Sequence, residues 1–143
     1  MPEPDVTLAA FMPDSDERLQ WLGPPLGVSS FGINVIALRP RQRMRVHVHE
    51  RQEEVYVVLD GELTLIVEGN EHRLRRGQLA RVGPATRRQV VNRGPERLVL
   101  LIVGASAANI HDPGDARAWE SWEESGDGRP ARDVPLPEDL PAK

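Results

Sequence analysis

The sequence predicts an all-β fold, an antiparallel sandwich or barrel, on three observations. Residues 28–104 contain about eight short segments rich in β-branched and aliphatic side chains. Glycine, proline, asparagine and aspartate separate these segments at close and regular intervals. The region has no long helical pattern of apolar residues. Short strands separated by turn residues are typical of sandwiches and barrels.

Length and composition exclude several classes of protein. The 143 residues are the length of one domain with a single core. The sequence contains no cysteine, which excludes disulfides, zinc ribbons and thiol nucleophiles. The formal net charge is −4 and no block is rich in lysine or arginine, so we expect neither nucleic acid nor a membrane as a partner.

The sequence also indicates a cytoplasmic protein. Residues 1–5 have no basic start and lead into no apolar segment, which argues against a secretory signal. The longest apolar run, residues 98–103, is far too short to span a bilayer.

We predict a single domain, residues 1–143, in four parts. Residues 1–27 form an N-terminal arm with a short helix, and residues 28–104 form the β-barrel. Residues 105–128 form a C-terminal helical region. Residues 129–143 contain four prolines and form an extended tail that we expect to be poorly ordered.

The helix of the N-terminal arm is predicted from a capping pattern. Asp14 and Glu17 can cap a helix that runs through Leu22. The sequence Gly23-Pro24-Pro25 then ends the helix.

A second helix is predicted to begin at Asp112-Pro113. The spacing of Ala116, Trp119 and Trp122 places them on one face of this helix. Two tryptophans on a short helix require burial, either against the barrel wall or against a second subunit. We expect a homodimer.

The predicted strands lie between these two helices. Asp60-Gly61 and Gly69-Asn70 are typical of tight hairpin turns. Arg45, His47 and His49 alternate along one strand, so their side chains point to the same face. The strands are expected at residues 31–38, 43–49, 55–59, 63–67, 72–74, 78–82, 89–91 and 97–103.

One motif carries a family resemblance. His47-x-His49, four residues, Glu54, six residues and Gly61 resemble the first conserved motif of the cupin superfamily. The resemblance covers residues 29–104. It implies a double-stranded β-helix, a barrel of the jelly-roll type, with two histidines and one glutamate as metal ligands.

A second stretch resembles the second cupin motif but departs from it at a decisive position. Gly77, five residues, Gly83-Pro84-Ala85, two residues, Arg88, three residues and Asn92 follow the expected spacing. Arg88 stands where the family has a histidine, its fourth metal ligand. Arginine stays protonated and offers no lone pair, so it cannot ligate a cation.

The first interpretation of the site is a divalent metal held by His47, His49 and Glu54 alone, with open positions for water or substrate. Iron, manganese, nickel and zinc are equally compatible, and no organic cofactor is expected. Arg88 would then grip an anionic group of a small-molecule substrate or pair with Glu53 or Glu54. For an enzyme, the resemblance implies oxygenase or isomerase chemistry on a small anionic metabolite.

Two other interpretations stay open. In a metal-free ligand-binding or sensing protein, Arg88 pairs with Glu54 or with an anionic ligand, and the histidines bind or protonate that ligand. In a structural protein, the same residues form a hydrogen-bond network without a ligand. A register slip of one residue would turn Gln89 inward in place of Arg88.

The candidate catalytic residues are Tyr56, Arg88 and Arg45. Tyr56 shares the face of Glu54 and is either a substrate contact or a core aromatic residue. Arg45 lies either at the cavity mouth or in an exposed salt bridge.

Other polar residues are assigned no chemistry. Glu53 is expected to point away from Glu54 into solvent. His72 is expected on the surface and His111 near a helix end or the cavity rim. Asn92 is expected to hydrogen-bond in a turn.

Overall fold

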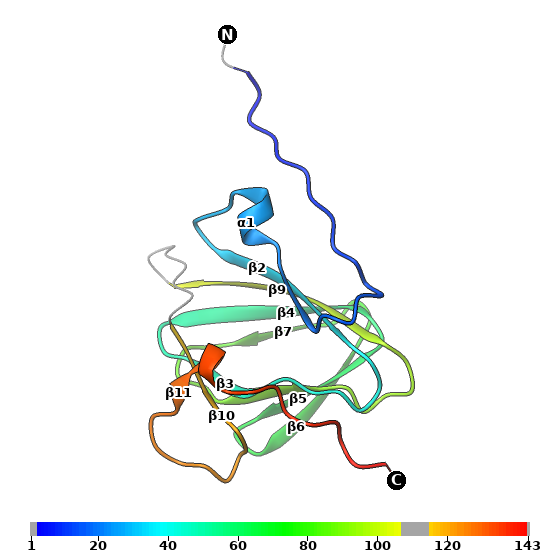
Figure 1. Ribbon diagram of the computed structural model, residues 1–143, viewed down its shortest axis with the longest axis vertical. Coiled ribbons are helices and arrows are strands. Elements are labelled where there is room, and N and C mark those ends of the chain that lie inside the picture. Colours follow the sequence, from blue (N-terminus) through cyan, green and yellow to red (C-terminus); the bar gives the residue numbers. More distant parts are fainter. Residues whose placement is uncertain (1–2, 107–114, 143) are drawn as a thin grey trace.

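The computed structural model describes residues 3–106 and 115–142 and contains two antiparallel sheets that face each other (Figure 1). The first sheet has the strand order β1-β2-β9-β4-β7 and the second has the order β11-β10-β3-β8-β5-β6. This arrangement confirms the predicted all-β barrel. The first sheet comprises β1 (Leu19–Trp21), β2 (Gly32–Leu38), β4 (Gln52–Asp60), β7 (Leu79–Val82) and β9 (Leu98–Ser106).

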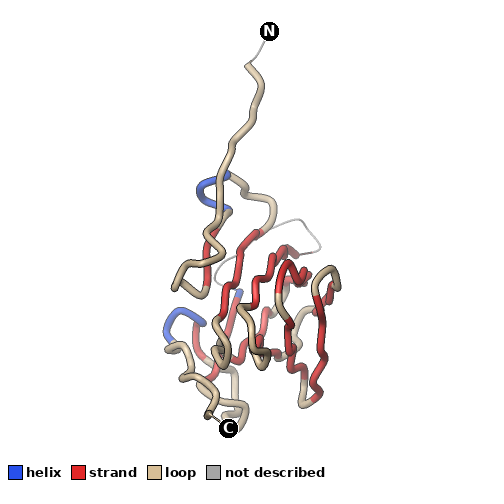
Figure 2. The backbone as a smooth tube through the Cα atoms, turned by 90° about the vertical axis from the view of Figure 1, so that its right-hand side faces the viewer, coloured by secondary structure: helices blue, strands red, loops and turns tan. Residues whose placement is uncertain are grey.

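The second sheet supplies the strand that carries the histidine pair. It comprises β3 (Val46–His49), β5 (Glu62–Val67), β6 (Asn70–Arg75), β8 (Arg88–Val91), β10 (Ala116–Trp119) and β11 (Arg129–Pro130). Figure 2 shows the strands gathered in the body of the molecule, with the N-terminal segment projecting away from it. None of the helices among the described residues is long and apolar enough to cross a membrane.

The core lies between the two sheets. Branched side chains fill it because alternate residues of every strand point inward. Tyr56 is the one aromatic residue of this main core cluster. Its fully buried aliphatic members include Leu38, Leu63, Leu98, Leu100 and Val90.

The turn predicted at Asp60-Gly61 joins the two sheets and is not a hairpin. β4 pairs with β7 and β9, whereas β5 pairs with β6 and β8. Gly61 has a φ of 79°, and a Cβ atom there would collide with the backbone carbonyl of Arg97. The corner therefore requires glycine on both conformational and steric grounds. The hairpin predicted near Gly69 does join β5 to β6, with positive φ at Glu68 and Gly69.

The predicted N-terminal helix is wrong in its position. Residues 19–21 form strand β1, which pairs with the edge of β2. The helix is instead α1, Gly23–Leu26, which contains the two prolines expected to end it. Proline is accommodated in a first helical turn, where its missing N–H has no partner to lose. For residues 19–21, pairing with the open edge of β2 is therefore more favourable than the helix that the capping pattern predicts.

The predicted C-terminal helix is also wrong in the part that the structure describes. Ala116–Trp119 form β10, which pairs with β3, while Asp112-Pro113 lie outside the described residues. Trp119 is buried against Val46 and Val48, and the guanidinium of Arg87 stacks 3.9 Å from its ring centre. Trp119 is therefore buried against the barrel wall and not against a second subunit.

The C-terminal tail is extended, but it is held on the barrel. It contains one short 3₁₀ turn, Ala131–Asp133, followed by the buried side chain of Val134. Three arginine side chains from the rest of the chain donate to backbone carbonyl groups of the tail. The Leu140 N–H of the tail donates to the Arg41 carbonyl. These donors are Arg45 to Val134, Arg18 to Pro137 and Arg43 to Glu138. These hydrogen bonds hold the tail in place, whereas the sequence predicted a poorly ordered tail.

Candidate metal and ligand site

A cavity of about 430 Å³ opens between the two sheets, and the His-His-Glu motif lies in its wall. Strands β1, β2, β3, β4, β9 and β10 contribute residues to it. The C-terminal tail closes one side through Pro130, Ala131 and Arg132. Its apolar lining includes Leu19, Trp21, Ile36, Met44 and Ile102.

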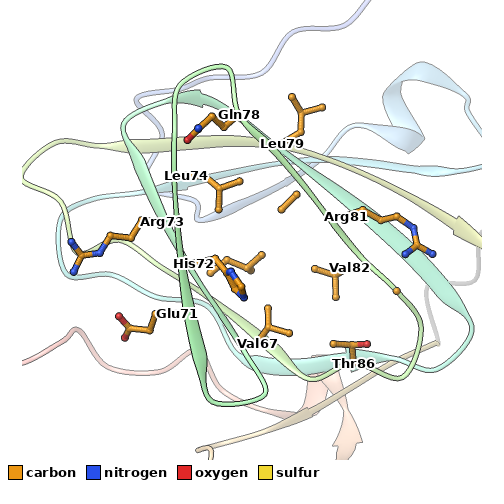
Figure 3. Close-up of a pocket in the computed structure, with 13 residues that line it drawn as sticks. Val67, Glu71, His72, Arg73, Leu74, Gln78, Leu79, Arg81, Val82 and Thr86 are labelled. Carbon is orange, nitrogen blue, oxygen red and sulfur yellow. The ribbon is translucent and has the colours of Figure 1, made fainter.

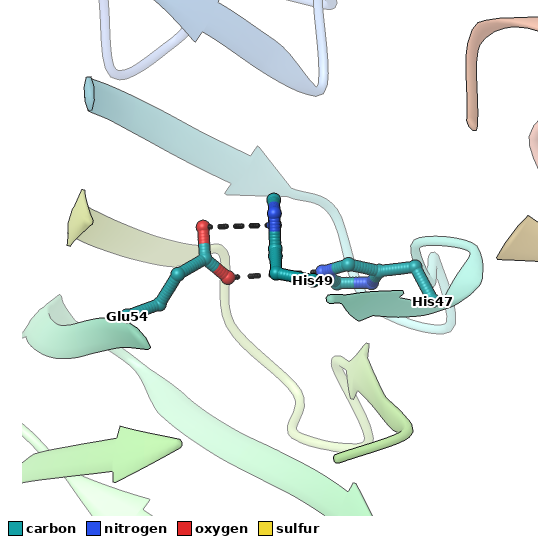
Figure 4. Close-up of side chains that lie close together, drawn as sticks. All are labelled: His47, His49 and Glu54. Carbon is teal, nitrogen blue, oxygen red and sulfur yellow. Dashed lines mark ion pairs between the residues drawn. The ribbon is translucent and has the colours of Figure 1, made fainter. Parts of the chain in front are cut away.

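His47, His49 and Glu54 converge in this cavity, as the motif predicted (Figure 4). The two imidazoles extend from the same face of β3, with ring centres 5.3 Å apart and ring planes nearly perpendicular. Glu54 faces them from β4 in the other sheet. Its Oε2 atom lies 3.3 Å from Nε2 of His49, and its Oε1 atom lies 3.8 Å from Nε2 of His47.

Arg88 points into the same cluster and is fully buried. Its Nη2 donates to Oε1 of Glu54 at 2.6 Å, its Nε donates to the Tyr56 hydroxyl at 3.1 Å, and its Nη1 donates to the Thr86 carbonyl at 2.9 Å. All three nitrogens are thus occupied by protein acceptors. Arg88 compensates the charge of Glu54, and it is not among the residues that line the cavity.

Tyr56 connects Arg88 to Glu54. Its hydroxyl accepts from Arg88 and donates to Oε1 of Glu54 at 2.8 Å. The ring belongs to the main core cluster and also lines the cavity, so both interpretations of Tyr56 hold in part. Burial and the neighbouring carboxylate raise the pKa of the Tyr56 hydroxyl, which therefore stays protonated and able to donate.

The electrostatics of the cluster favour an ionised Glu54 and a neutral His47. Burial alone would raise the pKa of Glu54, but His47, His49 and the charge of Arg88 outweigh it and hold the pKa well below its usual range. Burial is the largest influence on His47 and lowers its pKa. A neutral imidazole beside a carboxylate is the protonation state that divalent metals require of their ligands.

The ring orientation of His47 follows from its other nitrogen. Nδ1 lies 3.2 Å from the backbone carbonyl oxygen of Arg45, which only accepts hydrogen bonds. In the neutral tautomer that donates from Nδ1 to this carbonyl, Nε2 presents a lone pair to the cluster.

Asp115 is the charged residue beside the other nitrogen of His49. Its fully buried carboxylate accepts the backbone N–H groups of Arg51 and Gln52 at 3.0–3.1 Å. Its Oδ2 lies 3.7 Å from Nδ1 of His49, a buried nitrogen without a hydrogen-bond partner. No motif marks Asp115, because β10 brings it to His49 only through its pairing with β3.

The three motif residues fit a divalent cation. Their candidate ligand atoms all lie within 4.8 Å of one another, and two ligands about 2.1 Å from one ion lie at most about 4.2 Å apart, so small side-chain movements would bring all three to an ion. Two imidazoles and one carboxylate suit iron, manganese, nickel or zinc. Oε2 of Glu54 faces His49 while Arg88 holds Oε1, so one carboxylate oxygen stays available for an ion.

The other predicted orientations hold. Glu53 points away from Glu54 and pairs with Arg81 at 2.6 Å. Gln89 points away from the cavity, donating to the Met44 carbonyl and accepting from Trp122, so no register slip occurs. Asn92 is buried and donates to the Leu38 and Glu96 carbonyls, as a turn-fixing residue does.

Arg45 lies on the cavity wall, half-buried, and donates to the Val134 carbonyl. Its burial and the nearby charge of Arg18 lower its pKa. His72 is exposed as expected, and His111 lies outside the described residues.

A second hollow, of about 700 Å³, lies between β6 and β7 (Figure 3). Leu74 and Val82 line it together with the exposed His72 and Arg81. Among the described residues, the His-His-Glu cluster is the one group of three or more potential metal ligands found, and it lies in the first cavity. The first cavity, and not this hollow, therefore holds the potential metal ligands found among the described residues.

Comparison with known proteins agrees with this architecture. A family model described as Cupin domain matches residues 34–104. The chain matches no curated protein. A cupin protein from Bacteroides fragilis has the same fold, with a TM-score of 0.65 and 16% identity over 77% of this chain and 92% of that one.

Two solved structures are closer in sequence. The TT1209 protein of Thermus thermophilus is 30% identical over 64% of this chain and 87% of its own, with a TM-score of 0.56. A sugar phosphate isomerase of the cupin superfamily from Silicibacter pomeroyi is 28% identical over 71% of this chain, with a TM-score of 0.60. This chain spans 64% of that isomerase, less than two thirds of its length. With the barrel, the His-His-Glu motif and the family match in agreement, the chain belongs to the cupin superfamily as a conserved-barrel domain.

Proposed function

We propose that this chain is a cytoplasmic, metal-dependent isomerase that acts on a small phosphorylated sugar, with a divalent metal held by His47, His49 and Glu54. One observation carries the metal assignment. Nε2 of His47 and Nε2 of His49 lie 3.8 Å and 3.3 Å from the two oxygens of the Glu54 carboxylate, so three potential ligands converge on one point. These electron-rich atoms are stable together when a cation lies between them.

The chemical role of the metal follows from the usual behaviour of such ions. Held by His47, His49 and Glu54, a divalent ion would supply Lewis-acid chemistry at an oxygen of the substrate, as an aldose–ketose isomerisation requires. Other side chains of the cavity position the ligand residues and form the cavity wall. Arg88 and Tyr56 fix the Glu54 carboxylate, and Ile36 and Ile102 contribute apolar side chains to the cavity wall.

The substrate class is supported by the charges of the cavity and by similarity. Arg45 and Arg132 line the cavity with Glu54, whose charge Arg88 compensates. An anionic substrate is therefore favoured. The 28% identity to a sugar phosphate isomerase makes a phosphorylated sugar the preferred member of that class.

The test is the interconversion of aldose and ketose phosphates by protein loaded with iron, manganese, nickel or zinc. We expect turnover with at least one pentose or hexose phosphate, lost in His47→Ala/His49→Ala. Glu53→Gln is the matched control, because that carboxylate neighbours Glu54 in sequence but points to solvent. Metal-loaded wild type that converts none of these substrates contradicts the proposal.

A second candidate is supported by the 2.6 Å contact between Arg88 and Glu54. In a metal-free ligand-binding protein, this pair would be structural, and a proton on Nε2 of His49 would stabilise the other carboxylate oxygen. Such a protein binds an anionic ligand without metal and catalyses nothing. Ligand affinity that is unchanged by a chelator, in a protein without turnover, identifies this case.

A further inference from the structure

The C-terminal tail contributes a charged residue to the cavity that no motif predicts. Arg132 belongs to the 3₁₀ turn, residues 131–133, and lines the cavity together with its neighbours Pro130 and Ala131. Its side chain is exposed, and the described residues include no carboxylate in ion-pair contact with it. An arginine at a cavity mouth without an acidic partner is available to a ligand.

Arg45 directly precedes strand β3 and is hydrogen-bonded to the residue that follows the same 3₁₀ turn. It lines the cavity from the β3 side and donates through Nε to the carbonyl of Val134, two residues after Arg132. Within the described part of the chain, no carboxylate forms an ion pair with Arg45. The bond to Val134 thus fixes the tail against Arg45 and holds both arginines at one cavity.

The charges around the cavity are unbalanced. Glu54 is the one acidic side chain among the described lining residues, and the buried Arg88 already compensates it. The charges of Arg45 and Arg132 therefore have no carboxylate partner among the described residues. Two such guanidinium groups beside a cavity favour a doubly charged oxyanion, because each can donate two parallel hydrogen bonds to it.

We propose that Arg45 and Arg132 form the binding site for the phosphate group of a phosphomonoester ligand. The inference rests on the proposed function for the identity of that ligand, but not for the existence of the anion site. The phosphate lies at the cavity mouth, and the remainder of the ligand extends toward His47, His49 and Glu54. The tail is thereby a specificity element, because it supplies half of the phosphate site.

The experiment is calorimetric titration of the full-length, chelator-treated protein with inorganic phosphate, and separately with acetate. We expect saturable phosphate binding that is at least about tenfold weaker in Arg132→Gln, since hydrogen bonds to charged groups are lost. Arg129→Gln is the matched control. Arg129 lies on the same tail and is exposed, but it pairs with Glu120 and does not line the cavity.

Thermal unfolding tests whether the variant is correctly folded. Because Arg132 is exposed, its substitution should leave the melting temperature unchanged. Phosphate binding that is equal in wild type and Arg132→Gln overturns the inference, as does acetate binding with the affinity of phosphate. His47→Ala/His49→Ala should retain phosphate binding. A protein that binds phosphate through Arg132 but holds no metal would refute the proposed function and leave this site standing.

Discussion

Nη2 of Arg88 lies 2.6 Å from Oε1 of Glu54. The buried guanidinium of Arg88 therefore occupies the position at which the cupin motif has its fourth metal ligand. The pair makes the donor set of His47, His49 and Glu54 electrically neutral as a whole. A divalent ion bound there keeps most of its charge, which weakens its binding and favours an anionic ligand beside it. Arg88 would therefore influence a metal bound there through Glu54, since its own side chain does not line the cavity.

Breaking this pair should destabilise the protein. Arg88→Met leaves the Glu54 carboxylate, only 12% exposed, without its cation, and we expect a loss of about 3–5 kcal/mol in the free energy of unfolding. Urea denaturation of metal-free protein measures it. The double variant Arg88→Met/Glu54→Gln should lose less than the sum of the two single variants, because no unpaired charge remains. Strict additivity would mean that the two groups do not interact.

Restoring the missing ligand should strengthen metal binding. Arg88→His removes the repelling charge and adds an imidazole at the fourth position, so we expect metal affinity to rise by at least about tenfold. Competition with a chromogenic chelator measures the dissociation constant. Arg88→Gln is the control, since it removes the charge and adds no strong ligand. Equal affinities of the two variants would show that residue 88 does not reach the metal.

Asp115 should act as a positioning residue for His49. We expect Asp115→Asn to weaken metal binding by about 10–100-fold, because the Nδ1 atom of His49 loses its carboxylate neighbour. The asparagine retains an oxygen acceptor for the Arg51 and Gln52 N–H groups, and the melting temperature reports whether that loop is intact. Asp133→Asn, an exposed change, is the control. Unchanged metal affinity in Asp115→Asn refutes this role.

The N-terminal arm should mediate a homodimer, which we propose from its exposed apolar residues. Val6, Leu8 and Met12 are 73%, 88% and 69% exposed, and an arm of this kind is stabilised by a second copy. Light scattering should give the mass of a dimer for wild type and of a monomer for Val6→Asp/Leu8→Asp. Thr7→Asp/Ala9→Asp, on alternate positions, is the control. A monomeric wild type contradicts the proposal.

The sequence was sufficient for the features that depend on alternation. His47, His49, Glu54 and Tyr56 face one cavity because strand side chains alternate, and motif spacing placed Arg88 opposite Glu54. The barrel strands were predictable because each is bounded by turn residues. These properties are local, and a residue pattern records them directly.

The errors concern features that depend on distant partners. Residues 19–21 and 116–119 look helical by spacing, but the first pairs with β2 at the edge of one sheet and the second pairs with β3 in the other. This pairing outweighs local propensity. Gly61 marks a turn, yet only the packing of its backbone on Arg97 makes it a corner between sheets. Asp115 and Arg132 enter the site through segments far from the motifs, so no local pattern identifies them.

Elemental analysis of untagged protein tests the central claim most directly. We predict one iron, manganese, nickel or zinc ion per chain in wild type, and its loss in His47→Ala/His49→Ala. The melting temperature of the metal-free wild type, before and after addition of each ion, provides an independent measure of binding. Wild type that is purified without metal and cannot be reconstituted with any of the four ions would contradict the account.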